Sequence, residues 1–307
     1  MTSILLAIAV TAASSLTAPG PNGPLAGTLL NAGHGAPVVV IIPGSGPTDR
    51  DGNSPLGVTA ANLRLLAEGL ATRGISTVRI DKRGMFGSKA AVANGNDVTI
   101  ADYAADAHAW AKAARSATGV KCVWLLGHSE GSLVALAAGQ DPRDLCGVIS
   151  VSGMGRKFAA VLREQLNANP ANAPILAPAL ATIDSLEAGR PVDSKTLPAP
   201  LQPLFNDSVQ PYLIKLMAQD PARLAVSLKL PLLIVQGDRD LQVKVADASA
   251  LAKAQPKAKL ILLPGVNHVL KIVATDDRAA NIATYADPSL PIAPGVVDAV
   301  AGFVKPR

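Results

Sequence analysis

Aromatic side chains and blocks of charge are both scarce in this sequence. Phe, Trp and Tyr make up 3% of the 307 residues, which leaves few platforms on which nucleic-acid bases could stack. The net charge of +5 is spread along the chain without a run of Lys or Arg, so we expect no nucleic-acid partner. Charged residues reach 17% and hydrophobic residues 49%, a balance typical of a compact globular enzyme and not of a disordered chain.

Long apolar runs are missing as well. No stretch of about 20 apolar residues is present, so the sequence predicts no integral membrane span. A shorter apolar run covers residues 4–10, small residues follow at 11–15, and the first charged residue is Asp49. This pattern is similar to a secretory signal without its positive n-region, and an N-terminal strand is the alternative for residues 1–18. A cleaved signal would make the protein periplasmic or secreted, and otherwise we expect it in the cytoplasm.

The chain has only two cysteines, Cys122 and Cys146, and each stands just before an apolar, strand-like run. If these two strands are parallel neighbours, both sulfur atoms lie at the same edge of the sheet. A disulfide is then possible, and it would fit export to an oxidising compartment. Two buried thiols are the alternative.

Strand-like apolar runs alternate with segments of helical periodicity along most of the chain. This alternation predicts an α/β fold, with a mostly parallel sheet covered by helices on both faces. We expect the loop at residues 31–36 to join the first two strands as a hairpin-like turn. The expected strands are residues 25–30, 37–42, 76–80, 121–126, 146–152, 231–235 and 259–263, and the clearest helices are 62–72, 99–117 and 294–304.

Residues 153–228 interrupt this alternation. They form helical pieces broken by several prolines and contain no clear strand. A segment of this kind between two strands predicts a helical cap over the active-site edge of the sheet. Residues 19–152 and 229–307 would then form the core.

A candidate nucleophile stands at the centre of residues 127–131, which read Gly-His-Ser-Glu-Gly. Four apolar residues precede this segment and a helical pattern of small residues follows it. A strand, a sharp turn and a helix in this order are typical of a nucleophile elbow, which would expose the hydroxyl of Ser129. The alternative is a glycine-rich turn between two buried elements.

A serine hydroxyl near neutral pH needs a base within hydrogen-bond reach. The chain has four histidines. We expect His128 to point away from its neighbour Ser129, His108 to lie in the middle of a helix, and His34 to lie in a turn far from the site. His268, which follows the last strand, is therefore the predicted base.

The third group of an elbow-type triad lies between the serine and the histidine in chain order. Asp238 and Asp240 both follow the strand at residues 231–235. The Gly-x-x-Asp spacing lets the chain turn before it presents a carboxylate, which favours Asp240 as the partner of His268. For Asp238 the alternative role is a turn residue that caps backbone amides or pairs with Arg239.

A tetrahedral intermediate also needs two hydrogen-bond donors for its oxyanion. The backbone N–H of Glu130, directly after the nucleophile, is one predicted donor. Ser45, in the glycine-rich loop after the strand at 37–42, is the other, and its two flanking glycines are alternatives. The side chain of Glu130 either pairs with Lys82 or Arg83 or faces solvent.

Four separated motifs carry a family resemblance: Pro-Gly-Ser-Gly-Pro-Thr-Asp-Arg-Asp-Gly-Asn at 43–53, Asp-Lys-Arg-Gly at 81–84, the elbow at 127–131, and Asn-His at 267–268. From residue 25 onward the chain resembles the α/β-hydrolase superfamily, and more narrowly the bacterial carboxylesterases often labelled as serine aminopeptidase-like hydrolases. This resemblance implies an eight-stranded sheet, a cap after the sixth strand, no cofactor, and hydrolysis of small-molecule esters with short acyl chains.

The leading hypothesis is therefore a serine carboxylesterase that forms an acyl-serine intermediate. A peptidase or amidase with the same triad is the alternative within the enzyme class. A catalytically silent binding protein of the same fold is a third reading, but such proteins usually lack a triad residue, and every triad residue is present here.

Overall fold

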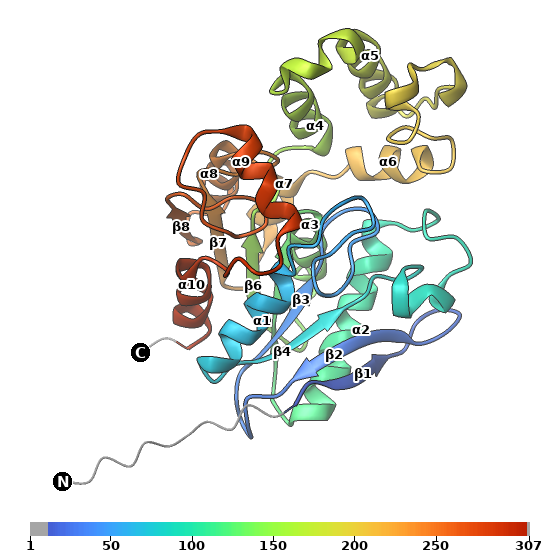
Figure 1. Cartoon of the computed structure of the whole chain (residues 1–307). Coiled ribbons are helices and arrows are strands. Elements are labelled where there is room, and N and C mark those ends of the chain that lie inside the picture. Colours follow the sequence, from blue (N-terminus) through green and yellow to red (C-terminus); the bar gives the residue numbers. More distant parts are fainter. Residues whose placement is uncertain (1–11, 306–307) are drawn as a thin grey trace, which may run out of the picture.

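An eight-stranded sheet forms the centre of the computed structural model, which describes residues 12–305 (Figure 1). The strand order is β1-β2-β4-β3-β5-β6-β7-β8. β1 and β2 pair antiparallel, β2 and β4 pair antiparallel, and all the other pairs are parallel, as the alternation of strands and helices predicts. The strands are β1 (Ser14–Ala18), β2 (Leu25–Leu30), β3 (Val38–Ile42), β4 (Ser76–Ile80), β5 (Val123–His128), β6 (Leu145–Val151), β7 (Leu232–Gly237) and β8 (Lys259–Leu263).

The expected hairpin between the first two strong strands is wrong. β2 pairs with β4, and β3 lies between β4 and β5. All five residues of β3 are buried apolar side chains, which suits a strand covered on both faces in the middle of a parallel sheet. β2 alternates buried and half-buried residues over most of its length, so it fits nearer the edge.

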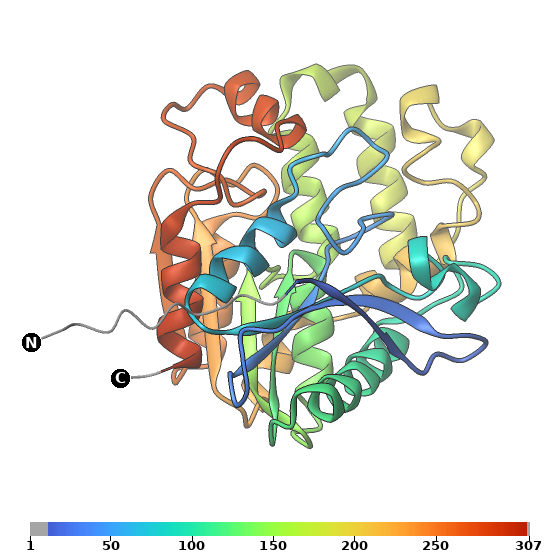
Figure 2. The ribbon, with the colours of Figure 1, turned by 60° about the horizontal axis from the view of Figure 1, so that its bottom comes forward.

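Helices cover both faces of the sheet. On one face α1 (Asn62–Thr72) and α10 (Pro294–Val304) lie side by side and share one apolar cluster with the sheet (Figures 1 and 2). On the other face α2 (Ile100–Thr118), α3 (Glu130–Ala138) and α8 (Val245–Ala254) share a second cluster. α2 begins where the side chain of Thr99 accepts the N–H of Asp102 and the Asp102 carboxylate accepts the N–H of Thr99, a capping box.

The segment between β6 and β7 is a helical insertion with a small core of its own. α4, α5 and α6 lie above the sheet in Figure 1, while α7 packs against α3 and α8. Ile183, Phe205 and Met217 are among the buried side chains that hold the insertion together. Residues 153–228 contain no strand, as expected from their sequence. The helices are α4 (Phe158–Asn167), α5 (Leu176–Glu187), α6 (Gln210–Met217) and α7 (Pro221–Ser227), with short 3-10 turns between them.

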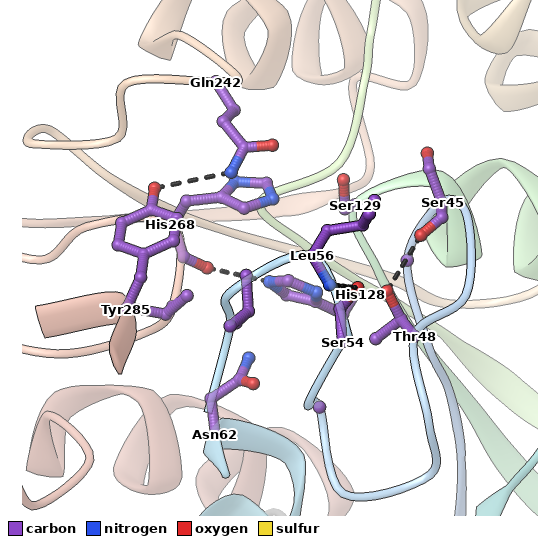
Figure 3. Close-up of a pocket in the computed structure, with 14 residues that line it drawn as sticks. Ser45, Thr48, Ser54, Leu56, Asn62, His128, Ser129, Gln242, His268 and Tyr285 are labelled. Atoms are coloured by element: carbon purple, nitrogen blue, oxygen red, sulfur yellow. Dashed lines mark hydrogen bonds between the residues drawn. The ribbon is translucent and has the colours of Figure 1, made fainter. Parts of the chain in front are cut away.

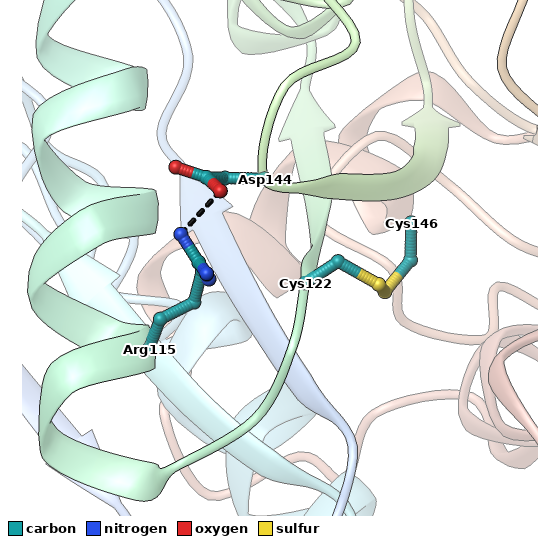
Figure 4. The surroundings of a disulfide bond; sticks show 4 residues. All are labelled: Arg115, Cys122, Asp144 and Cys146. Atoms are coloured by element: carbon teal, nitrogen blue, oxygen red, sulfur yellow. Dashed lines mark ion pairs between the residues drawn. A yellow bond between two sulfur atoms is a disulfide. The ribbon is translucent and has the colours of Figure 1, made fainter.

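A disulfide joins Cys122 and Cys146, as one of the two sequence alternatives predicts (Figure 4). The two cysteines stand at the amino-terminal ends of β5 and β6, which are parallel neighbours. An ion pair between Arg115 and Asp144 lies close by. The bond is therefore at the edge of the sheet opposite to the one where Ser129 follows β5.

The sequence predicts a signal peptide or an N-terminal strand at residues 1–18, and the structure describes only the last part of this segment. β1 is a mostly exposed strand at the edge of the sheet. The apolar run at residues 4–10, on which the signal-peptide prediction depends, lies outside the described residues. Across residues 12–305 the structure has no helix with the length and apolar character needed to cross a bilayer.

Candidate active site

Ser129 occupies the sharp turn between β5 and α3. Its backbone angles, φ 56° and ψ −121°, lie in a region that side-chain-bearing residues rarely adopt. The turn closes so tightly that a Cβ atom on Gly127 would lie 2.0 Å from the carbonyl oxygen of Gly131, and one on Gly131 would lie 2.3 Å from that of Ile42. Only glycine fits at these two positions, which explains the Gly-x-Ser-x-Gly spacing.

His268 and Asp240 form a buried hydrogen-bonded pair, with 2.8 Å between Nδ1 of the ring and Oδ2 of the carboxylate. The other carboxylate oxygen accepts the N–H groups of Gln242 at 2.7 Å and Val243 at 2.9 Å. Burial raises the pKa of Asp240, but His268 and these two N–H groups together outweigh it, so the pKa lies below its usual value. The carboxylate is therefore charged and can fix the tautomer of His268.

Asp238 has a different role. Its carboxylate accepts the N–H of Gly265 at 2.7 Å, in the loop that carries His268. It therefore caps a backbone amide, which is one of the roles considered for it from the sequence. The structure brings Asp240, and not Asp238, to the ring of His268.

Ser129 and His268 line the same pocket, a cavity of about 240 Å³. His268, Gln242 and Tyr285 lie on one side of it, Ser45 and Thr48 on the other, and Ser129 between them (Figure 3). Within residues 12–305 no hydrogen bond joins the Ser129 hydroxyl to His268. Catalytic hydrogen bonds of this kind are often loose before substrate binds. Gln242 and Tyr285 had no signal in the sequence, because their positions depend on loop paths.

His128 does not point away from the site, contrary to expectation. It lines the pocket, and its Nε2 donates to the backbone oxygen of His268 at 2.8 Å. Burial, and to a lesser extent the neighbouring His268, lowers the pKa of His128 to about 3, so the ring is neutral. His128 thus supports the backbone of the predicted base.

The other two histidines lie elsewhere. His34 is exposed in the loop between β2 and β3. Nε2 of His108, on α2, lies 3.1 Å from the backbone oxygen of Ala138. Neither lines the pocket with Ser129.

The two predicted oxyanion donors, Ser45 and Glu130, both lie close to Ser129: Ser45 lines the same pocket, and Glu130 follows Ser129 in the chain. Glu130 is the first residue of α3, where backbone N–H groups have no partner within the helix. The Gly44 backbone lies against Ser129, since a Cβ on Gly44 would lie 3.2 Å from that of Ser129, and Ser45 follows it into the pocket. Within residues 12–305 the N–H groups of Ser45 and Glu130 donate to no other acceptor.

The side chain of Glu130 is buried and pairs with Lys82, so the solvent-facing alternative is wrong. Arg83, the other candidate partner, instead binds the carboxylates of Asp102 and Asp106 on α2. The sequence motif at 81–84 therefore places two neighbouring cations against different helices.

Ion pairs also hold the glycine-rich loop that follows β3. Asp81 accepts the backbone N–H of Arg50 at 2.9 Å and pairs with its guanidinium. Asp51 of the same loop pairs with Arg79 of β4. The 43–53 and 81–84 motifs are thus in direct contact. Among residues 12–305 no group of three or more His, Cys, Asp or Glu side chains is arranged to hold a metal ion.

Residues 39–284 match the profile of the family described as the alpha/beta hydrolase family. The chain belongs to the alpha/beta hydrolase family. The resemblance seen in the sequence and the predicted α/β-hydrolase fold are both confirmed. In this α/β hydrolase the elbow with Ser129 and the buried His268–Asp240 pair follow the carboxyl-terminal ends of β5, β7 and β8, so they lie at the same edge of the sheet.

Proteins named as esterases are among the relatives of this α/β hydrolase. It is 27% identical over 241 residues to Esterase EstD of Thermotoga maritima. The aligned region covers 76% of this chain and 54% of EstD, so the chain spans about half of the relative's length. Among solved structures, Est1E from Butyrivibrio proteoclasticus has a TM-score of 0.56 and 18% identity, over 94% of this chain and 99% of that one. A thermophilic esterase from Thermogutta terrifontis has a TM-score of 0.55 and 17% identity, over 96% and 98%. At these identities the two structures show the shared fold.

Proposed function

We propose that this α/β hydrolase is a serine carboxylesterase that acts on esters with short acyl chains. The observation that carries the proposal is the buried hydrogen bond of 2.8 Å between His268 and Asp240, in the same pocket as the strained Ser129. A nucleophile, a base and a group that orients the base are the three parts that acyl transfer needs. Esterase EstD of Thermotoga maritima, a relative at 27% identity, supports the same reaction class.

In the proposed reaction the Ser129 hydroxyl attacks the ester carbonyl carbon, and Nε2 of His268 takes its proton. The charge that develops on the carbonyl oxygen is stabilised by the N–H groups of Ser45 and Glu130. When the intermediate collapses, the carbon–oxygen bond to the alcohol breaks and His268 gives its proton to the leaving alcohol. Water, activated by His268, then cleaves the acyl-serine and releases the acid.

The size and lining of the pocket favour small substrates. Its volume of about 240 Å³ lies below the range of about 300 to 1,000 Å³ that is usual for drug-sized ligands. Leu56, Val58 and Val269 supply apolar surface near the serine, which suits a short alkyl chain. Among the described residues that line the pocket none is Arg or Lys, so none of them supplies a cation that would favour a charged acyl group.

We further propose that the enzyme works in an oxidising compartment, the periplasm or the exterior. The Cys122–Cys146 disulfide supports this, because such bonds persist in oxidising compartments and are rare in the cytosol. Detection of the enzyme in the periplasmic fraction of its host would support this proposal, and confinement to the cytosol would contradict it.

Two classes of substrate and one probe test the proposed reaction. We expect p-nitrophenyl acetate and butyrate to be hydrolysed and aminoacyl p-nitroanilides to remain intact, since a peptidase would release p-nitroaniline. A fluorophosphonate should label the wild type with one group per chain and should not label Ser129→Ala. Hydrolysis of anilides at a rate comparable to esters would favour the peptidase reading, and absence of labelling in the wild type would favour a silent binding protein.

A further inference from the structure

Lys82 contacts the peptide that contains the N–H of Ser45 and the side chain of Glu130, and the proposed reaction does not use it. Its side chain is buried, with an exposed fraction of 3% for the residue, in the loop that follows β4. Nζ donates to the backbone oxygen of Gly44 at 2.6 Å and lies 3.4 Å from Oε1 of Glu130. The ammonium also lies 5.5 Å from the centre of the Tyr103 ring, within the range of a cation–π contact.

The contact with Gly44 fixes the direction of a peptide group. The backbone oxygen of Gly44 and the N–H of Ser45 belong to the same planar trans peptide, so they point to opposite sides of it. A hydrogen bond that holds the oxygen on Lys82 therefore also holds the N–H of Ser45 on the opposite side. Glycines flank Ser45 in this loop, and without an anchor a glycine-containing peptide can rotate at little cost.

The ammonium of Lys82 also contacts the side chain of Glu130, the residue of the second predicted oxyanion donor. Glu130 supplies the other N–H, and its carboxylate is the ion-pair partner of Lys82. The distances rank the two contacts: 2.6 Å to the peptide oxygen is a short, charge-assisted hydrogen bond, whereas 3.4 Å to the carboxylate is long. The peptide oxygen is thus the closer partner of Lys82, and the carboxylate balances its charge.

Fold stability alone does not explain why Lys82 and Glu130 form a buried ion pair. Taking two charges out of water costs several kcal/mol per ion, and well-packed apolar residues in place of a buried ion pair are often equally stable. A buried cation close to the site where negative charge develops also favours that charge electrostatically.

We propose that Lys82 is a positioning residue for the oxyanion hole, which it organises by holding the Gly44–Ser45 peptide and the side chain of Glu130. This inference rests on the proposed esterase function. It assigns a role to the Asp-Lys-Arg-Gly motif at 81–84: its lysine aims a hydrogen-bond donor, while its aspartate and arginine hold neighbouring segments in place.

The test compares Glu130→Gln with the double variant Lys82→Met/Glu130→Gln. Both remove the charge of Glu130, so neither leaves an unpaired buried carboxylate. They differ in the Lys82 ammonium, which the double variant loses together with its contacts to the Gly44 oxygen and the Tyr103 ring. With p-nitrophenyl acetate we expect kcat of the double variant to fall about 100- to 1,000-fold below that of Glu130→Gln, the usual cost of one lost oxyanion donor, while KM changes less than about threefold. Lys89→Met, which removes an exposed lysine of the adjacent turn, is the control and should keep the wild-type kcat.

A trifluoromethyl ketone separates positioning from general damage, because it binds to the serine as an oxyanion. Its inhibition constant should rise between the two variants by the same factor as kcat falls, while thermal melts show both to be folded. Equal kcat values and inhibition constants for the two variants, in an active wild type, would overturn the role of Lys82 alone. A wild type that neither hydrolyses the ester nor reacts with a fluorophosphonate would overturn the proposed function and this inference with it.

Discussion

Asp238 and Asp240 follow β7 and are two residues apart, yet their carboxylates accept hydrogen bonds from different groups. Asp240 is buried against the ring of His268, whereas Asp238 accepts the backbone N–H of Gly265. A charged carboxylate next to an imidazole stabilises the imidazolium that forms when the serine loses its proton. The difference between the two aspartates should therefore appear in turnover.

We expect Asp240→Asn to lower kcat by about 1,000- to 10,000-fold, because an amide can hold His268 in the wrong tautomer. Asp238→Asn should change kcat by less than about fivefold, since it alters one hydrogen bond at the start of a loop. Steady-state kinetics on p-nitrophenyl acetate, with circular dichroism to establish folding, would measure both. A larger loss in Asp238→Asn would contradict the assignment.

His128 makes the stability of the enzyme sensitive to mild acid. Its pKa is lowered by burial to about 3 in the folded protein, against about 6.5 when it is exposed in the unfolded chain. Between these two values the unfolded chain binds a proton that the folded protein does not, so stability falls as the pH falls. One such proton is worth about 1.4 kcal/mol per pH unit.

His128→Gln keeps a hydrogen-bond donor and removes the titrating ring. We expect the free energy of unfolding of the wild type to fall more steeply than that of His128→Gln between pH 6 and 4, by about 1.4 kcal/mol per pH unit. Urea titrations at several pH values would measure the two slopes. His34→Gln, at an exposed histidine, is the control and should keep the steeper slope. Parallel slopes for the wild type and His128→Gln would refute this account.

At the scale of elements, loops close to the sheet supply most of the residues that line the pocket. The lining residues come from the segment between β3 and α1, the elbow, and the loops after β7 and β8. Ser54 and Val58 pair in a small bridge that carries Leu56 at its tip, where the side chain is 79% exposed and lines the pocket. This small hairpin, residues 54–58, is therefore placed to contact the acyl or alcohol chain.

Leu56→Ala should shift the preference among acyl chains. A longer alkyl chain covers more of Leu56, so we expect the ratio of kcat/KM for p-nitrophenyl butyrate to that for acetate to fall about fivefold, which corresponds to about 1 kcal/mol of lost apolar contact. Leu204→Ala changes a leucine of the helical insertion that is 39% exposed and does not line the pocket, and it should leave the ratio unchanged. An effect of Leu204→Ala alone would instead support control by the helical insertion.

The parts of the fold that could be predicted from the sequence are those whose signal is local. Apolar strand runs, the glycines of the elbow and the order of serine, aspartate and histidine are all readable within a few residues. The hairpin error arose because a short connection between β2 and β3 does not reveal that β4 comes between them. The position of His128 depends on the loop that carries His268, which lies 140 residues away in the chain. The contact of Lys82 with Gly44 also joins segments that are distant in sequence.

At the scale of the whole molecule, the disulfide contributes to global stability without touching the site. Cys122 and Cys146 are 24 residues apart, and a closed loop of this length is expected to stabilise the fold by about 3 kcal/mol through the unfolded chain. We expect Cys122→Ser/Cys146→Ser to lose about this amount in urea unfolding and to keep kcat in its folded fraction, because the bond lies at the opposite edge of the sheet. Mass spectrometry should find no free thiol in the wild type. Two free thiols would contradict the bond, and a large loss of kcat would contradict its independence from the site.

Hydrogen bonds join the loop that carries Asp240 to the loop that carries His268. The N–H of Arg239 donates to the oxygen of Val266 at 3.0 Å, and Asp238 holds the N–H of Gly265. A protein engineer should therefore treat these two loops as one unit. Residues 237–240 and 264–268 should be exchanged together between family members, because exchanging either loop alone would misalign the aspartate and the histidine. Hairpin 54–58 supplies none of these contacts, so libraries that retune substrate choice can vary it separately.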